Sequence, residues 1–559
     1  MAEISSFRQA ADHVLKRIAR AEQRRVERES LWRSLQHYVR PTALAFRETQ
    51  GAADTRERRI LESTAARSLE LFASFLMSSV LVAGTSGAAA FRFVGIGADG
   101  KEVFSAAARE WLEEAVKEVR NVLFSGAYSA SGCLHNVCLD LGLYGSSCFA
   151  AWEGPDPLLR PVIFRHYPVW RVCGELGDGE RPSFICVQEE LTPQQATARW
   201  PEAAAAGMFE RQDQAVRVRF VCISREDGDY DAFVPPNIAA TNVAWAGVWY
   251  LEETKYILDA RGYPEQPIFL PAWYIVDDTV WGRSPAMTAL GDVISANVLM
   301  EMIIKGTEKL VEPPWLVRDG ALLSPLRAYP NGITYTDGEQ GLQPLLPPGA
   351  SRIEMGVEML RDRAAQIERA FFVHLFQDAP NPLGSKQPRT ATEVAIQQDE
   401  RNRAVTPMVM RLQATMIEPL LWRVLGLLVR SGRLSAPPLP EGTRLEVRHQ
   451  SPVVASQAQV DGMAIARFME SLLAMAQANP EVLDYVNMDA AAKLLHVASG
   501  APSAVLRSDT EVKRLRAQRA EQAAAAQQVE MANEGGKTLA ALISAQAKSG
   551  GRGGMGVVG

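Results

Sequence analysis

The sequence predicts an α+β protein in which a mixed region of helices and strands precedes two long helices. Short runs rich in Val, Ile and aromatic residues, separated by Gly, Pro and Asp, fill residues 147–253. Two long helix-compatible runs, 286–311 and 351–377, flank a segment rich in Pro and Gly. The chain then returns to helical sequence after residue 454. With 559 residues, 47% of them hydrophobic, the chain can form several domains with buried cores.

Charge and cysteine usage narrow the possible classes of protein. A net charge of −6 and a pI near 5.8 exclude a strongly basic protein that coats nucleic acid, although an acidic protein can still enclose DNA loosely. The six cysteines lie between residues 133 and 222 without a CxxC pair, which indicates reduced thiols and a cytosolic setting. The N-terminus reads as a charged helix over residues 3–38 without the apolar core of a signal peptide, so nothing points to export.

Residues 71–91, LFASFLMSSVLVAGTSGAAAF, form a charge-free stretch that is long enough to cross a membrane. Serines interrupt it, Gly84 and Gly87 are placed to end a helix, and its apolar positions continue a stripe that begins at Leu61 in charged sequence. These features favour a packed helix over residues 57–83. A membrane-associated scaffold that uses this stretch remains as an alternative.

The remainder of the first region alternates helix and strand. EWLEEAVKEVRNVLFSG and CLHNVCLDLGLYG predict two further helices, and the β-type runs begin at Ser147. LTPQQATARWP, at 191–201, predicts a short inserted helix with Thr192 as its cap and an end before Pro201.

Two helices and the module between them predict a hairpin-shaped stalk. The first helix follows GRSP and ends at Glu312 before Pro313 and Pro314. The segment 312–350 reads as a small β-containing module rich in turns, and the helix at 351–377 returns the chain. The first helix carries more apolar positions than a lone two-helix hairpin can bury, so we expect neighbouring copies to cover Leu299, Ile303 and Ile304.

The segment after the stalk changes character several times. DAPNPLGSKQPR, at 378–389, predicts a loop, and TATE at 390–393 fits a capping box that opens a helix reaching about Arg430. Pro407 and Pro419 should kink this helix. GTRLEVRHQSP predicts a strand, residues 454–530 predict helices, and the Gly-rich end within 531–559 predicts a flexible tail.

No constellation of residues in the sequence predicts a catalytic, metal or cofactor site. EGGKTLA, at 534–540, resembles the end of a phosphate-binding loop, but Met531 stands where the motif needs Gly. Cys133, His135 and Cys138 lack a matching second pair of zinc ligands and read as buried thiols. The basic residues of the Pro-rich loop allow two interpretations, solvated surface charges or contacts to a phosphate backbone.

Several segments together resemble the portal, or head-to-tail connector, proteins of short-tailed phages of the podovirus type. In the order that this family shows, they are LWRSLQHYVRP, ILESTAARSLELFASFLMSSV, LTPQQATARWP, WGRSPAMTALGDVISANVL, EPPWLVRDG, RTATEV and PEVLDYVNMD. The likeness runs over nearly the whole chain. It also implies that residues 71–91 belong to a wing helix followed by a turn and the strand FRFVGIG.

The resemblance implies a portal fold with an α+β wing, a two-helix stem, a small β-containing clip and a C-terminal helical crown. The implied divisions are wing 1–285, stem helix 286–311, clip 312–350, return stem helix 351–377, tunnel loop 378–389, kinked wing helix and strand 390–453, crown 454–530 and tail 531–559. The crown is short for the family, and the tail has no counterpart in it.

The resemblance further implies a dodecameric ring at one capsid vertex, in the virion and, during assembly, in the host cytoplasm. Double-stranded DNA would pass through its channel, and terminase, tail adaptor proteins, capsid and scaffolding proteins would be its partners, without a membrane or a cofactor. Twelve copies would carry a charge of about −72, which suits sliding rather than tight binding of DNA.

The position of the tunnel loop in the resembling family falls on residues 378–389. The expected channel residues are Asn381, Leu383, Gly384, Lys386 and Arg389. The other class of function that stays open is an enzyme of phage maturation, a nuclease or protease, whose site the motifs do not reveal.

Overall fold

The computed structural model consists of two compact units, and each is described by itself. The first comprises Met1–Arg92, Glu114–Ala436 and Val447–Met463, and the second comprises Phe93–Glu113, Pro437–Glu446 and Ala464–Gly559. The structure describes residues 2–41, 60–78, 91–97, 106–125, 129–177, 179, 181–209, 215–233, 243–276, 278–312, 315–317, 319, 322, 324–326, 334–335, 342–344, 350–376, 406–438, 443–449, 452–476, 486–499, 507, 511–522, 537 and 541–544.

A five-stranded antiparallel sheet forms the centre of the first unit. Its strands follow one another in chain order, β4 (Val172–Leu176), β5 (Pro182–Leu191), β6 (Val216–Ser224), β7 (Trp245–Leu251) and β8 (Ile257–Tyr263). Between β5 and β6 the chain forms α6 (Pro193–Arg199) and α7 (Pro201–Ala205), and between β6 and β7 it forms α8 (Tyr230–Phe233). The sheet therefore arises from hairpin connections, of which one carries α6, the short helix predicted at 191–201, and the unpredicted α7.

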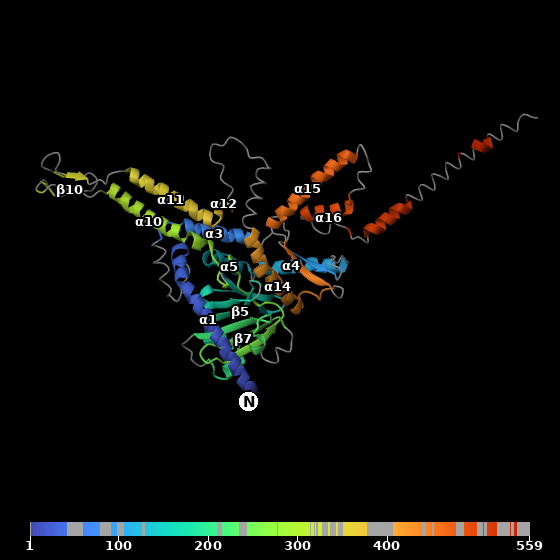
Figure 1. Ribbon diagram of the computed structural model, residues 1–559, viewed down its shortest axis with the longest axis horizontal. Helices are drawn as coiled ribbons and strands as arrows, with labels where there is room; N and C mark the ends of the chain where they lie inside the picture. The colour runs from blue at the N-terminus through green and yellow to red at the C-terminus, as the bar shows by residue number, and fades with distance from the viewer. Residues whose placement is uncertain are drawn as a thin grey trace, which may run out of the picture. The chain divides into compact units, whose positions relative to one another are not determined.

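The long N-terminal helix α1 (Ala2–Val39) covers this sheet (Figure 1). Its buried positions Val14, Ile18 and Ala21 recur at spacings of three and four and pack against Phe184 and Val221 of the strands. One face of α1 thus closes this core against the strands.

A smaller sheet lies beside helices that pack on one another. It has the order β3–β2–β9, with β2 at Cys148–Asp156, β3 at Arg160–Tyr167 and β9 at Ile268–Phe269, and a short 3-10 helix, η2 (Val169–Arg171), leads into β4. The helix α5 (Ser131–Tyr144) precedes β2 and packs against α3 (Thr64–Leu76). Gly142 permits this close packing, because a Cβ there would lie 2.6 Å from a methyl carbon of Leu69.

Two long helices of the first unit form a hairpin that we call the stem. Helix α10 (Pro285–Val311) runs alongside α11 (Ala350–Ala370), and the short strands β10 (Trp315–Val317) and β11 (Leu342–Pro344) pair antiparallel in the segment between them (Figure 1). Helix α12 (Val373–Phe376) follows α11.

A helix from Thr406 to Arg430 contains a π-helical segment, Gln413–Ile417, directly before α14 (Glu418–Arg430). Pro419 removes a backbone donor and crowds the preceding turn, which explains the local change of hydrogen bonding. The predicted irregularity at Pro419 is confirmed, whereas the capping box at 390–393 lies outside the described residues.

The second unit contains part of each of four elements that continue into the first. These are β1 (Phe91–Ile96), α4 (Ala106–Phe124), β12 (Arg444–His449) and α15 (Pro452–Ala476). The strand β1 pairs with β12, and α16 (Met488–Ser499) follows in the chain. Arg516 forms a two-pronged ion pair with Asp489, at 2.6 and 2.8 Å between guanidinium nitrogens and carboxylate oxygens.

The structure confirms the predicted α+β class and corrects several element boundaries. Helix α3 begins at Thr64 instead of residue 57, and the return helix of the stem stops at Ala370 instead of continuing to 377. Phe372 adopts a φ of 60°, which interrupts the helix although no Gly or Pro marks the position. The strands β8 and β9 have no counterpart among the predictions.

Two described helices are long and apolar enough to cross a membrane by length and composition, and neither includes the stretch 71–91. In Thr406–Arg430 most of the apolar window is buried (61%), as in a core helix, whereas in α10 only 17% is buried. Within 71–91 the described part of α3 buries Phe72, Ala73 and Leu76 inside the first unit, as expected for a packed helix. Of these two described helices, α10 is therefore the one that its own chain covers less.

Candidate functional site

The base of the stem is fixed by one serine that serves two partners. The Ser284 hydroxyl accepts a hydrogen bond from the Met287 amide at 2.9 Å, which caps α10, and it donates to the Leu143 carbonyl of α5 at 2.8 Å. Pro285 occupies the first helical position, where a missing N–H costs nothing. The sequence GRSP therefore both starts α10 and attaches it to α5.

The backbones of two segments meet directly next to this cap. Gly145 has a φ of 78°, and a Cβ at that residue would lie 2.4 Å from the Gly282 carbonyl oxygen, closer than a side chain allows. The buried Ser146 hydroxyl accepts from the Gly282 amide at 2.7 Å and donates to the Val280 carbonyl at 3.0 Å. We call this contact between residues 143–146 and 280–284 the stem root.

The two stem helices approach each other through small residues. A Cβ at Gly306 would lie 3.6 Å from Ile353, and a Cβ at Gly356 would lie 3.3 Å from Ile303, so each helix offers a glycine to an isoleucine of the other. Nearer the base, Arg363 of α11 donates to Asp292 of α10 at 2.7 Å. This packing holds the hairpin together within one chain.

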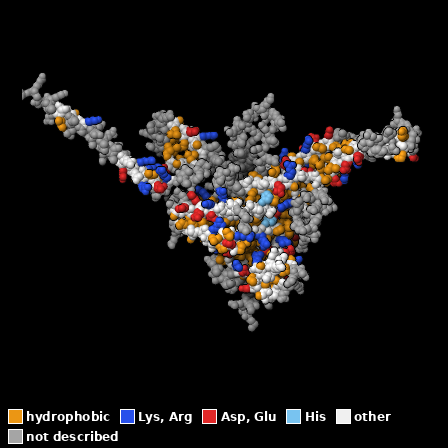
Figure 2. Space-filling view, turned by 180° about the vertical axis from the view of Figure 1, so that it is seen from behind, with side chains coloured by type: hydrophobic (Ala, Val, Ile, Leu, Met, Phe, Trp, Pro, Cys, Tyr) orange, Lys and Arg blue, Asp and Glu red, His pale blue; other side chains and the backbone are white. Residues whose placement is uncertain are grey.

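Large apolar side chains on the stem remain in solvent. They are Val298 (43% exposed), Met302 (63%), Met355 (63%) and Met359 (46%), and each helix presents its pair at a spacing of four residues, which places the pair on one face. Figure 2 shows hydrophobic side chains along this hairpin, at the upper right of the view, with charged side chains next to them. An apolar surface of this kind is typical of an interface with another molecule.

The structure describes the residues that the sequence predicts at the interface, but not those that it predicts in the channel. Leu299, Ile303 and Ile304 lie on α10 and are half-buried, and Ile303 packs against Gly356 of its own chain. Val298 is among the apolar positions that the sequence shows on this helix, whereas the more exposed Met302 was not singled out, because periodicity alone does not show which apolar face α11 covers. Asn381, Leu383, Gly384, Lys386 and Arg389 lie outside the described residues.

A cluster of aromatic rings lies at the C-terminal end of α11, beside α3. Phe371 is fully buried and lies 6.4 Å from the ring of Phe72, which is 5.0 Å from Trp273. Phe372, the residue with positive φ, lies 6.3 Å from the same Trp273. Because the helix breaks after Ala370, the side chains of Phe371 and Phe372 both reach this cluster. Their contacts fix the C-terminal end of α11.

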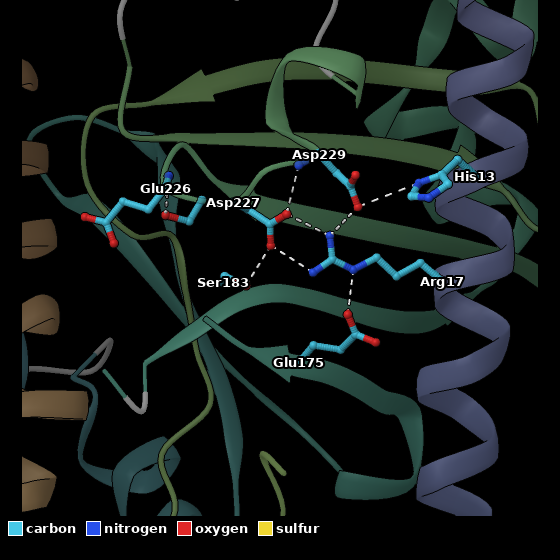
Figure 3. A network of polar contacts seen from close by, with 8 residues as sticks. His13, Arg17, Glu175, Ser183, Glu226, Asp227 and Asp229 are labelled. Atoms are coloured by element: carbon cyan, nitrogen blue, oxygen red, sulfur yellow. Dashed lines mark hydrogen bonds and ion pairs between the residues drawn. The ribbon is translucent and has the colours of Figure 1, made fainter. Parts of the chain in front are cut away.

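The most highly connected polar cluster joins α1 to the central sheet (Figure 3). The Arg17 guanidinium donates to Glu175 at 2.6 Å, to both carboxylate oxygens of Asp227 at 2.8 Å and to Asp229 at 2.9 Å. Ser183 also donates to Asp227, at 2.7 Å. A shallow cavity of about 370 Å³ next to the cluster is lined by His13, Arg17, Arg20, Glu175, Asp227, Gly228 and Asp229.

The electrostatics of this cluster indicate a structural role. Burial alone would raise the pKa of Asp227, but hydrogen bonds from Arg17, Ser183 and the Asp229 amide lower it to about 2. Because Arg17 donates hydrogen bonds to all three carboxylates, the cluster ties α1 to β4 and to the 227–229 turn. No sequence pattern marks this cluster, since the partners of Arg17 lie 158 to 212 residues away along the chain.

A second buried carboxylate is neutralised in the same way. Glu189 of β5 is 4% exposed and accepts from Arg165 at 2.7 Å and from Arg199 at 3.0 Å, and the Tyr167 hydroxyl donates to it as well. Arg199 also stacks on Trp249, with its guanidinium carbon 4.1 Å from the ring centroid. Glu189 is thus fully partnered and links β3, β5 and α6.

The cysteines behave as buried thiols, as the sequence predicts. Five of the six are buried and Cys133 is partly buried, and all six are free. Burial raises the pKa of Cys133 and of Cys138 to about 12, which keeps both protonated. Within the part of the chain that the structure describes, no three His, Cys, Asp or Glu residues are grouped so that they could hold a metal ion.

Portal proteins of two phages are similar to this chain over almost their full lengths. The probable portal protein of Bordetella phage BPP-1 is 26% identical over 552 residues, and the portal protein of Salmonella phage epsilon15 is 24% identical over 553 residues. In both cases the match covers 94% of this chain and 95% of the relative.

Among solved structures, chains from gene transfer agent particles are similar at 15% identity with a TM-score of 0.37. One comes from the neck of an empty particle computed with C6 symmetry, covering 72% of this chain and 86% of that one. Another comes from the virion of the native particle, covering 78% and 95%. The model of the family described as bacteriophage head to tail connecting protein matches residues 11–506. The chain therefore belongs to the family of bacteriophage head-to-tail connecting proteins.

Proposed function

We propose that this protein is a portal protein, a dodecameric ring at one vertex of a short-tailed phage capsid through which the genome is packaged, retained and released. Two full-length relatives that bear the name portal protein support the assignment. The observation that carries it is the exposed apolar surface of the stem. A chain that assembles through this surface in a heterologous, closing interface forms a ring.

In this proposal the stem hairpins stand side by side around the channel. Val298 and Met302 of α10, with Met355 and Met359 of α11, contact the stem of the next copy, and the predicted residues Leu299, Ile303 and Ile304 flank that contact. Burying these side chains removes apolar area from water and stabilises the assembly. The lack of cover over α10 within one chain is then a property of the isolated subunit.

The remaining parts of the chain receive roles by position. The segment 312–350, which includes β10 and β11, forms the clip where terminase and later tail adaptor proteins dock, and the wing meets capsid and scaffolding proteins. The loop 378–389 reaches into the channel, where Lys386 and Arg389 make sparse contacts with the phosphates of double-stranded DNA. The energy for DNA movement comes from terminase.

The stem interface can be tested with a charged double variant, Val298→Asp with Met302→Asp. Both positions are exposed in one subunit, so the subunit should fold, whereas two carboxylates in an apolar interface should abolish rings. Negative-stain electron microscopy and native mass spectrometry of the purified protein would report the assembly, and circular dichroism would report folding.

The control is Thr307→Asp, which adds one of these two carboxylates on α10 at a position roughly 140° around the helix from Met302. It should leave rings intact. Rings in the double variant, or loss of rings in the control alone, would overturn the assignment of this face. Flotation of the wild-type protein with lipid vesicles in place of ring formation would instead indicate that α10 contacts a membrane.

The channel loop can be tested separately with Lys386→Ser and Arg389→Ser together. Rings should form normally, while the amount of DNA packaged or retained should change and its dependence on salt should weaken. The pair Arg217→Ser and Arg261→Ser, which removes two exposed arginines elsewhere in the first unit, provides a charge-matched control. Unchanged packaging in the loop variant, with altered packaging in the control, would refute the proposed DNA contact.

A further inference from the structure

Two cysteines face each other across neighbouring strands of the central sheet. In the antiparallel register of β4 and β5, Cys173 lies directly opposite Cys186. The other strand cysteines are paired differently, with Cys148 opposite Tyr167, and Cys222 opposite Ile185 and Gly247. Cys173 and Cys186 are thus the one pair of strand cysteines in register with each other among the strands that the structure describes.

The geometry of this pair suits a covalent bond. Residues directly opposite each other in an antiparallel pair have Cα atoms about 4.5 or 5.5 Å apart, and both values fall inside the range of disulfides. The two thiols also contact each other, because the Cys173 side chain is hydrogen-bonded to that of Cys186. Both residues are 2% exposed and lie in the core between the sheet and α1.

We propose that Cys173 and Cys186 form a cross-strand disulfide when the protein meets a low-molecular-weight disulfide, and that α1 controls how fast this happens. The Cys173 thiolate attacks the small disulfide, which forms a mixed disulfide and releases one small thiol. The Cys186 thiolate then attacks that mixed disulfide at the Cys173 sulfur and releases the second small thiol. The two cysteines lose two protons and two electrons, which the two released thiols carry.

Access to the pair depends on the attachment of α1. Ile18 and Ala21 of α1 belong to the same core cluster as both cysteines, and Arg17 holds α1 to β4 through Glu175, only two residues after Cys173. Burial and the contact with Cys186 raise the pKa of the Cys173 thiol, so few thiolates form in the closed state. The reaction therefore requires a local opening of α1.

The experiment treats the purified full-length protein with oxidised glutathione, blocks remaining thiols under denaturing conditions and maps peptides without reduction by mass spectrometry. A cross-linked peptide pair containing Cys173 and Cys186 is expected, with two fewer free thiols than the six in the sequence. The same mapping in Cys222→Ser should give the same pair. In Cys186→Ser, a glutathione adduct on Cys173 is expected instead of a cross-link.

The role of α1 is tested by rate. Arg17→Ala should accelerate cross-linking by about tenfold or more, because several charge-assisted hydrogen bonds that oppose the opening are lost. The control Arg33→Ala, a 62% exposed position on the same helix, should react at the wild-type rate. The proposal would be overturned if Cys173 and Cys186 stayed free after oxidation of both the wild type and Arg17→Ala. A disulfide between another pair of cysteines would overturn it as well. Equal rates in all three proteins would overturn the role of α1.

Discussion

At the scale of single residues, Asp227 shows how one carboxylate links pH to the stability of the first unit. Its pKa lies at about 2 in the folded protein, below the ordinary value of 3.8, so the folded state gains stability above the ordinary value and loses it as the pH falls. Asp227→Asn should lower the free energy of unfolding by about 2 kcal/mol at pH 7 and by close to nothing near pH 2. Urea midpoints measured between pH 7 and pH 2.5 would follow this difference.

Asp231→Asn provides the control for this measurement. Asp231 lies on α8, close in sequence, and is exposed. Its midpoints should run parallel to those of the wild type at every pH. A constant difference between Asp227→Asn and the wild type across the whole range would mean that the carboxylate acts through packing and not through its charge.

Residue partnerships of this kind could not be predicted from the sequence. His13, Arg17 and Arg20 read there as charges of an N-terminal helix, and no pattern marks Glu175, Asp227 or Asp229. Their meeting depends on the fold of the intervening strands. The buried state of the cysteines could be predicted, because each stands in an apolar run.

At the scale of elements, the stem helices should respond differently to substitution at their two glycines. Gly306→Ala should stabilise α10 by about 1 kcal/mol, because alanine favours a helix interior and its Cβ would meet Ile353 at an ordinary distance of 3.6 Å. Gly356→Phe should separate the helices, because even a Cβ there would lie 3.3 Å from Ile303. Hydrogen exchange of the α10 and α11 amides would report both effects.

Gly291→Phe is the matched control for the larger substitution, since no atom lies within 4 Å of a Cβ built on Gly291. It should leave exchange in α11 unchanged. If the stem amides are equally protected from hydrogen exchange in Gly356→Phe and in Gly291→Phe, the contact between the glycines and isoleucines does not hold the hairpin together.

Helices and strands could be predicted where the chain marks their ends. Ser284 and Pro285 mark the start of α10, and Thr192 with Gln195 forms the capping box of α6. The strand β8 could not be predicted, because ILDARGY mixes charged and small residues at an edge of the sheet, where few side chains are buried. The end of α11 could not be predicted either. No helix-breaking residue marks it, and tertiary contacts of two phenylalanines cause it instead.

At the scale of the whole molecule, the match to the family ends at residue 506, before the Gly-rich end of the chain. A chain truncated after residue 530 should therefore assemble like the full-length protein. Native mass spectrometry of the two proteins side by side would check this expectation. Monomers or a changed copy number in the truncated protein would show that residues 531–559 take part in assembly.

The order of the large parts could be predicted from the sequence, whereas their assembly could not. Two long apolar-rich helices around a Pro/Gly-rich segment indicate a hairpin, and α10 and α11 confirm it. Which face of α10 stays open depends on where α11 lies, and this follows from the positions of Gly306 and Gly356. The number of copies in a ring depends on the angle between neighbouring subunits, and the sequence of one chain does not determine that angle.

The stem root also has a mechanical consequence. Backbone contact between Gly145 and Gly282, together with the hydrogen bonds of Ser146 and Ser284, leaves α10 without a hinge where it meets α5. We therefore expect the hairpin and α5 to move as one body. A force applied at β10 and β11 would turn α5 together with the stem, and β2, which follows directly after Ser146 and Ser147, would turn with them. A displacement at the tip of the hairpin would then reach the sheet without a change in the fold of either.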